Sequence, residues 1–100
     1  MTMNRTTMRY PKLEQTITAA EYILEFEDDR LGEESIGAIE ANLSKMRGLD
    51  KQIKMIPYRS SSAARDEANS KEYDALEARA DALIRETTEL LWPKAVEAAV

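Results

Sequence analysis

Apolar residues in the C-terminal half of the chain recur at the spacing of an α-helix, and no other feature constrains the fold as strongly. The repeat consists of Tyr73, Leu76, Ala80, Leu83, Thr87 and Leu90, separated by three, four, three, four and three positions. Residues three and four apart share one face of a helix, so the spacing predicts a helix with a continuous apolar stripe. We interpret the stripe as part of a core or of a homodimer seam, in preference to a docking site for a foreign helix.

Two earlier stretches show the same helical spacing. The first contains Leu13, Ile17, Ala20 and Leu24, and the second contains Ile36, Ile39, Leu43, Met46, Leu49, Ile53 and Ile56. Pro11 suits the first position of a helix, and Pro57 should end the second one. With 3 Gly and 3 Pro in 100 residues, the composition also favours helices over strands. The sequence therefore predicts an all-α fold, a compact helical bundle of about three to five helices in a single domain spanning residues 1–100.

The expected boundaries follow from residues that break helices. Residues 1–10 lack periodicity and are expected to form a flexible lead-in, and residues 57–62 should form a linker between two helical halves. Gly48 either kinks or breaks the second helix, and we favour a kinked continuation. The third helix either starts afresh at Asn69 or runs unbroken from Ala63. It should be interrupted at Trp92 and Pro93.

Missing residue types exclude most kinds of active site. The chain has no cysteine and no histidine, so it lacks a thiol nucleophile, the commonest metal ligand and the commonest general base. The serines at 60–62 have no histidine to activate them, and the acidic residues do not follow the order of a calcium-binding EF-hand loop. We therefore expect no catalytic residue, no cofactor and no metal site.

The hydropathy of the sequence predicts where in the cell the protein is found. Residues 1–10 lack the apolar core of a secretory signal, and no apolar run approaches the roughly 20 residues needed to cross a bilayer. The expectation is a cytoplasmic protein without a membrane partner.

The surplus negative charge of the chain is confined to residues 25–34. This stretch contains the carboxylates Glu25, Glu27, Asp28, Asp29, Glu33 and Glu34. Its one base is Arg30, so its net charge is -5, which equals the net charge of the whole chain. Acidic and basic residues therefore balance in the rest of the sequence.

Two of these six acids have a structural reason for their position, and the two aspartates could have one. The first helix should end near this stretch, with Gly32 in the left-handed conformation just beyond it. Glu33 and Glu34 then fall in the first turn of the next helix, where the helix dipole favours negative charge. Either of the two aspartates could cap that helix. Glu25 and Glu27 lie against the dipole, which favours a functional explanation for them.

Two aromatic residues adjoin the acidic stretch. Tyr22 and Phe26 lie one turn apart, on nearly the opposite side of the first helix from its apolar stripe. Either this helix is central in the bundle, or these aromatics belong to a binding surface. The candidate partner-binding residues are Tyr22, Glu25, Phe26, Glu27, Asp28, Asp29, Glu33 and Glu34.

A basic face on the second helix has two interpretations. Arg47, Lys51 and Lys54 project from the side opposite its apolar stripe and could follow nucleic-acid phosphates. However, the sequence pI is about 4.8, so direct nucleic-acid binding is disfavoured. Pairing with the acidic stretch, within one chain or between subunits, explains the bases equally well.

In size, composition and acidic cluster, though not in any aligned motif, the chain resembles phage-encoded inhibitors, especially small all-α anti-CRISPR proteins. The resemblance implies stoichiometric inhibition of a host CRISPR–Cas surveillance complex. Carboxylates would occupy the lysine and arginine side chains that this basic partner uses to bind nucleic acid. The alternative is a homo-oligomeric structural or assembly protein, with a homodimer as its simplest form.

Overall fold

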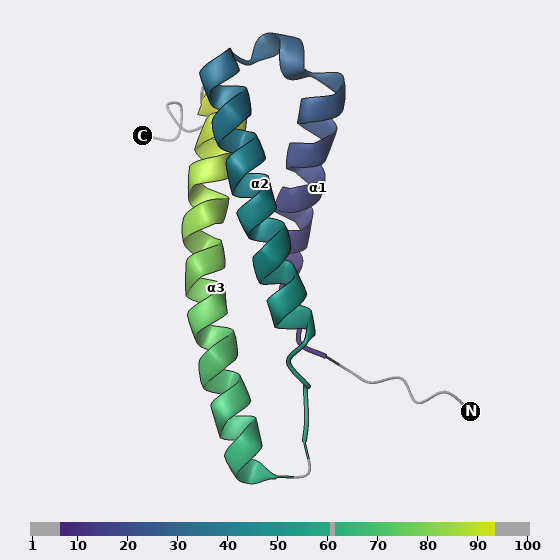
Figure 1. Cartoon of the computed structure of the whole chain (residues 1–100), viewed down its shortest axis with the longest axis vertical. Helices are drawn as coiled ribbons and strands as arrows, with labels where there is room; N and C mark the ends of the chain where they lie inside the picture. Colours follow the sequence, from purple (N-terminus) through teal and green to yellow (C-terminus); the bar gives the residue numbers. More distant parts are fainter. Residues whose placement is uncertain (1–6, 61, 94–100) are drawn as a thin grey trace, which may run out of the picture.

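The computed structural model describes residues 7–60 and 62–93, and in this part of the chain it confirms the all-α fold. Helix α1 (Pro11–Phe26) is joined by the short 3-10 helix η1 (Asp28–Arg30) to α2 (Glu33–Lys54), and a linker leads to α3 (Ala63–Leu91). Figure 1 shows α1 and α2 running in opposite directions and α3 returning beside both of them. Consequently η1 and the C-terminal end of α3 lie at the same end of the bundle.

The ends of α1 are close to the predicted ones. Pro11 occupies the first helical position, where its missing N–H leaves no carbonyl without a partner. Beyond Phe26, the N–H of Glu27 still donates to the carbonyl of Ile23 at 2.8 Å before the chain turns into η1. The side chains of Leu13, Ala20 and Ile23 are buried.

Helix α2 passes through Gly48 without a break. A Cβ atom at Gly48 would meet nothing within 4 Å, so no neighbouring helix requires a glycine there. Glu33 and Glu34 lie in the first turn, as predicted. The predicted left-handed Gly32 is wrong, because this residue has φ -74° and ψ 158° and forms the extended N-cap of α2.

Helix α3 is a single helix of 29 residues, so the fresh start at Asn69 is excluded in favour of the unbroken alternative. Its N-cap is Ser62, whose hydroxyl accepts a hydrogen bond from the N–H of Arg65 at 3.3 Å. The helix ends at Leu91, immediately before Trp92 and Pro93. The interruption at these two residues was predicted correctly, and residues 94–100 lie outside the described part.

The core is formed by one stripe from each helix. In α3 the buried positions are Leu76, Ala80, Ile84, Thr87 and Leu91. The predicted stripe shares Leu76, Ala80 and Thr87 with this set, but Leu83 is only partly buried and Ile84 takes the core position.

Asn42 and Thr87 are polar and buried between α2 and α3. The Asn42 side-chain amide donates to Glu86 at 3.0 Å, and the hydroxyl of Thr87 approaches the sulfur of Met46 at 3.9 Å.

Residues 7–10 differ from the expected flexible lead-in, whose residues 1–6 lie outside the described part. Thr7 forms an antiparallel bridge with Pro57, and the N–H of Met8 donates to the carbonyl of Ile56 at 2.9 Å. Met8 and Tyr10 pack against the core. Backbone pairing with the linker between α2 and α3 and side-chain packing against the core thus hold residues 7–10 in place.

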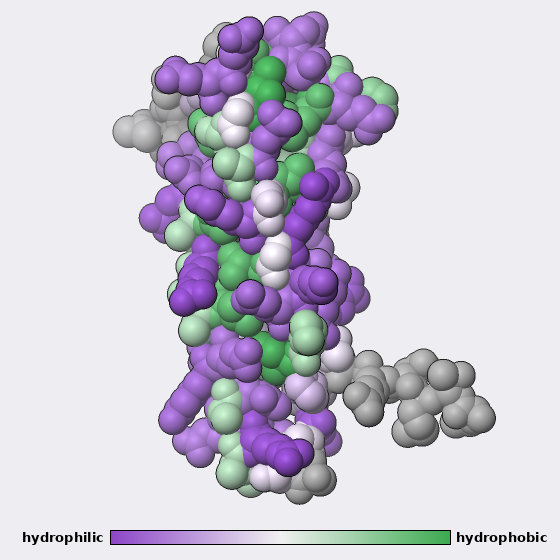
Figure 2. Space-filling view, viewed as in Figure 1, coloured by the Kyte–Doolittle hydropathy of each residue, from purple (hydrophilic) through white to green (hydrophobic). Residues whose placement is uncertain are grey.

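The face of the molecule seen in Figure 2 is mostly hydrophilic, with a narrow hydrophobic strip that runs down its middle along the bundle axis. In the described part of the chain, no helix combines the length and the apolar character needed to cross a membrane.

Candidate protein-binding surface

Ion pairs between α1 and α2 use most of the predicted basic face. Lys54 approaches Glu14 at 3.4 Å, and Arg47 pairs with Glu21 at 2.5 Å. The two acids are seven residues apart on α1, and the two bases are seven residues apart on α2, which runs in the opposite direction. The bases therefore pair within the chain, as one of the interpretations held. Their partners are acids on the side of α1, however, and not the acidic stretch.

This pattern of pairing stops where the acidic stretch begins. If the register set by Glu21 and Arg47 continues along the helices, the next position on α1, Glu25, lies opposite Leu43. Both residues line the same shallow depression, together with Leu24. Leu43 is apolar and offers no charge, so Glu25 lacks the counterion that Glu21 has.

Arg30, the base of the acidic stretch, holds this end of the bundle together. Its Nε atom lies 2.9 Å from the carboxylate of Glu27, and its Nη1 atom donates to the carbonyl oxygen of Leu91 at 3.0 Å. That carbonyl belongs to the last turn of α3, where backbone acceptors have no partner within the helix. Arg30 therefore satisfies an orphan acceptor and neutralises one acid.

The other five acids form what we term the acidic end. It consists of Glu25, Asp28, Asp29, Glu33 and Glu34. All five are exposed, and none forms an ion pair with another described residue. The two aspartates lie in η1 and do not cap α2, whose N-cap makes no side-chain hydrogen bond. Five negative charges thus lie around a single helix junction, and no base within residues 7–60 and 62–93 forms an ion pair with them.

Tyr22 and Phe26 lie on the surface beside the acidic end. Their exposed fractions are 54% and 63%, and their ring centroids are 4.9 Å apart. This face of α1 therefore lies outside the core. The exposure of Tyr22 and Phe26 contradicts the interpretation that α1 is a central helix with this face buried. Two large exposed rings in contact form the kind of apolar patch that often marks an interaction site. Their role in binding a partner stays a prediction.

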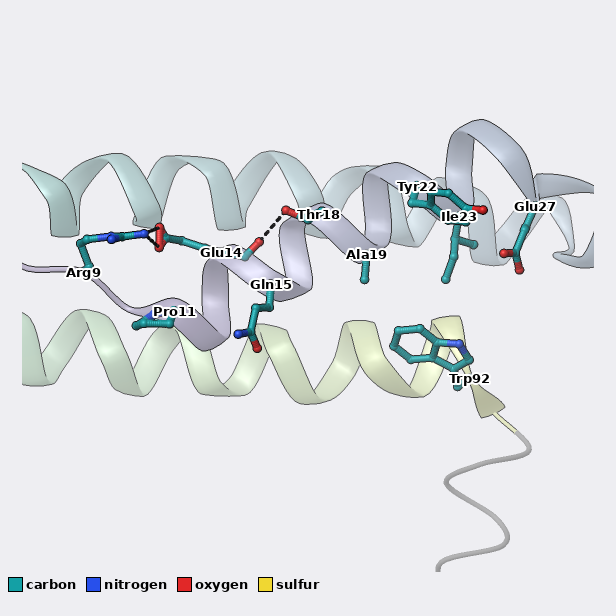
Figure 3. A pocket seen from close by; sticks show the side chains of 10 residues that line it. All are labelled: Arg9, Pro11, Glu14, Gln15, Thr18, Ala19, Tyr22, Ile23, Glu27 and Trp92. Carbon is teal, nitrogen blue, oxygen red and sulfur yellow. Dashed lines mark hydrogen bonds and ion pairs between the residues drawn. The ribbon is translucent and has the colours of Figure 1, made fainter.

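A groove extends from Tyr22 along α1 and was not predicted from the sequence. It has a volume of about 730 Å³. The residues that line it are Arg9, Pro11, Glu14, Gln15, Thr18, Ala19, Tyr22, Ile23, Glu27 and Trp92. In Figure 3, Ala19 and Ile23 point from α1 toward α3, and the indole of Trp92 lies across the gap from them. We call this feature the aromatic groove. Only the spatial arrangement of α1 and α3 brings Trp92 to it.

The charged groups at the other end of the groove are fixed by their neighbours. A hydrogen bond from Arg9 lowers the pKa of Glu14, and Lys54 lowers it further. The hydrogen bond to Asp50 is the main cause of the raised pKa of Lys54. One oxygen of Asp50 is buried and makes no hydrogen bond with the described residues. The shifts favour the charged forms of Glu14 and Lys54, so the ion pair between them favours the contact of α1 with α2.

Within residues 7–60 and 62–93, no group of three or more acidic residues is arranged to hold a metal ion. No known protein-family model, curated protein or solved structure matches the chain. Its function is therefore inferred from the charges and shape of its own surface.

Proposed function

We propose that this protein is a non-enzymatic inhibitor that binds a basic, nucleic-acid-binding protein complex through its acidic end. Binding would occupy the lysine and arginine side chains that the partner uses for phosphates, so nucleic acid would be excluded. The resemblance to anti-CRISPR proteins makes a host CRISPR–Cas surveillance complex the first candidate partner. The inhibitor would then act in the cytoplasm of the host cell.

One observation carries this proposal. Acidic side chains elsewhere on α1, such as Glu14 and Glu21, are matched by bases on α2, whereas the acidic end has no matching base among the described residues. Like charges that lie close together repel one another and lower stability. Glu33 and Glu34 are favoured by the dipole of α2, but Glu25, Asp28 and Asp29 form no ion pair with described residues that would offset their mutual repulsion. A cationic partner would account for this cluster.

Two triple variants test the role of the acidic end. In the first, Glu25→Gln, Asp28→Asn and Asp29→Asn remove three exposed carboxylates but leave the Glu27–Arg30 pair intact. The matched control neutralises Glu72, Asp74 and Glu89, which are exposed on α3 and form no ion pair with described residues. Both variants have the same net charge, so a difference between them reflects position alone.

The readout is capture of proteins from a bacterial lysate, identified by mass spectrometry, with and without added nucleic acid. We expect the parent and the control variant to capture a basic nucleic-acid-binding complex, and added nucleic acid to compete with capture. The acidic-end variant should lose capture while its melting temperature stays the same or rises, because repulsion is relieved. Equal capture by both variants, or capture unaffected by nucleic acid, would contradict the proposal.

The alternative, a homo-oligomeric assembly protein, needed the basic segment to meet the acidic stretch across subunits. Arg47 and Lys54 instead pair with acids of the same chain, so two of the three bases of the basic face are already used within it. Size-exclusion chromatography at two salt concentrations separates the two proposals, because a charge-paired oligomer dissociates as salt rises. A salt-sensitive dimer would favour the alternative.

A further inference from the structure

We infer that the aromatic groove is a docking site for a helix of the partner, with an apolar face that enters the groove and arginine or lysine residues beside the acidic end. This inference rests on the proposed function for the charge of its ligand. It adds an apolar contact in the aromatic groove to the electrostatic contacts proposed for the acidic end.

The shape of the groove suits a helix. It runs along α1 from Pro11 to the turn that contains Ile23, which is about 18 Å at 1.5 Å per residue. Its floor near α3 contains the small Ala19 beside Ile23, so a neighbouring backbone can approach closely. An amphipathic helix that places residues spaced three and four apart in an apolar groove is a common mode of peptide recognition.

Aromatic side chains border the end of the groove near η1. Trp92 is the single tryptophan of the chain and is 40% exposed, and Tyr22, which also lines the groove, is 54% exposed. Tryptophan and tyrosine are the residues that most often dominate binding energy at interfaces, because they bury a large area with few rotatable bonds. Their faces also attract arginine and lysine side chains.

Charge identifies the occupant and its orientation. At one end of the groove, Arg9 neutralises Glu14 at 2.8 Å. At the other end, Glu27 leads directly into Asp28 and Asp29 of the acidic end. Glu27 itself pairs with Arg30, so a helix in the groove would meet paired carboxylates along it and the aspartates of η1, which form no ion pair with described residues, beyond its second end. Its basic residues should lie over the second end.

The chain carries its own reporter for the test, since Trp92 is its only tryptophan and lines the groove. The probe is a synthetic tryptophan-free helical peptide of about 16 residues, with leucine along one face and arginine on the other. One control peptide has serine in place of leucine, and a second has glutamate in place of arginine. Peptide is titrated into the full chain while Trp92 emission is recorded.

Binding of the leucine and arginine peptide should move Trp92 emission to shorter wavelengths in a saturable way, and both control peptides should bind at least about tenfold more weakly. Tyr22→Ser should weaken binding of the first peptide by about tenfold or more with little change in melting temperature. The matched control is Tyr58→Ser, because Tyr58 is 56% exposed but lies in the linker at the other end of the bundle. It should leave the affinity unchanged.

Four outcomes would overturn the inference. They are equal binding of the serine peptide, an unchanged affinity in Tyr22→Ser, the absence of any peptide-induced shift, and emission in the free protein that already matches a buried indole. The last would mean that residues 94–100 or a second copy fill the groove. None of these results bears on lysate capture by the acidic end. The inference about the groove can therefore be wrong while the proposed function is right. Conversely, peptide binding without capture would refute the proposed function alone.

Discussion

Arg30 donates a hydrogen bond to the carbonyl oxygen of Leu91 at 3.0 Å, so the turn between α1 and α2 is tied to the last residue of α3. The same guanidinium pairs with Glu27. Arg30 lies within a strongly acidic stretch, but its role is structural, because it joins all three helices at one end of the bundle.

Arg30→Gln should lower the free energy of unfolding by about 1 kcal/mol, because both contacts are lost and each is partly solvent-screened. Urea denaturation measures the change. Glu27→Gln serves as the control, since it removes the ion pair but keeps the hydrogen bond to Leu91. If Glu27→Gln costs as much as Arg30→Gln, the bond to Leu91 contributes nothing.

Gly37→Ala and Gly48→Ala should each raise the free energy of unfolding by about 0.5–1 kcal/mol. Both glycines lie inside α2, and an added Cβ would meet nothing within 4 Å, so only the helix propensity changes. Thermal denaturation of the two variants checks this. Gly32→Ala is the matched control, because Gly32 is an N-cap, a position where alanine is less favourable than glycine. A lower melting temperature for Gly48→Ala would reveal a kink that needs glycine.

Truncation of two adjacent residues on α3 distinguishes the core stripe from its edge. Ile84 is 5% exposed, and its change to alanine should cost about 2–4 kcal/mol. Leu83 is only partly buried and lines a groove against α2, so Leu83→Ala should cost about 1 kcal/mol. Chemical denaturation of both variants gives the difference. A larger effect at Leu83 would restore the originally predicted stripe.

Alkaline pH should destabilise the protein partly through Tyr10. The hydrogen bond to Asp81, followed by burial, raises the pKa of Tyr10 above its ordinary value of 10.0. In the unfolded chain the phenol loses its proton first, so this contribution is full below about pH 10 and is lost as pH rises further. Tyr10→Phe should therefore show a smaller loss of melting temperature than the parent between about pH 9 and 12.

The pKa values of Tyr73 and Lys54 are also raised, by burial and by the hydrogen bond to Asp50 respectively, so Tyr10→Phe retains part of the alkaline loss. Equal losses in Tyr10→Phe and the parent would show that the bond to Asp81 does not stabilise the fold.

Local chemistry was enough to predict where most helices begin and end. Pro11 starts α1 because proline suits the first helical position, and the pair Trp92 and Pro93 ends α3 because the residue before proline avoids the helical region. The start of α2 at Glu33 was placed from Gly32, correctly in position though not in conformation, and the helix dipole favours the two glutamates there. These signals need no knowledge of the rest of the fold.

Features that depend on packing could not be read from the sequence. A strict heptad has 3.5 residues per turn, whereas a straight helix has about 3.6, so the stripe drifts along a long helix. In α3 the drift moves the core from Leu83 and Leu90 to Ile84 and Leu91. Helix α3 continues through Asn69 without a break, so the capping-box spacing at this position did not start a new helix.

The candidate surface shows the same division. Its acids and the two aromatics on α1 were predicted from charge and periodicity, and their exposure agrees with a position outside the core. The partners of Arg47 and Lys54 depend on the antiparallel register of α1 and α2, which the sequence does not specify. Trp92 was expected only to end a helix, and its place across the groove from Ile23 results from the return of α3 beside α1.

The two ion pairs between α1 and α2 also determine how much freedom the intervening turn retains. Sliding α2 by one helical turn would place Glu21 opposite either Lys51 or Leu43, and Glu14 opposite either Tyr58 or Asp50, so at most one of the two pairs could form. The helices therefore favour one register, which restricts the backbone between them that carries the acidic end. A partner would bind a preorganised array, with little backbone entropy lost on association.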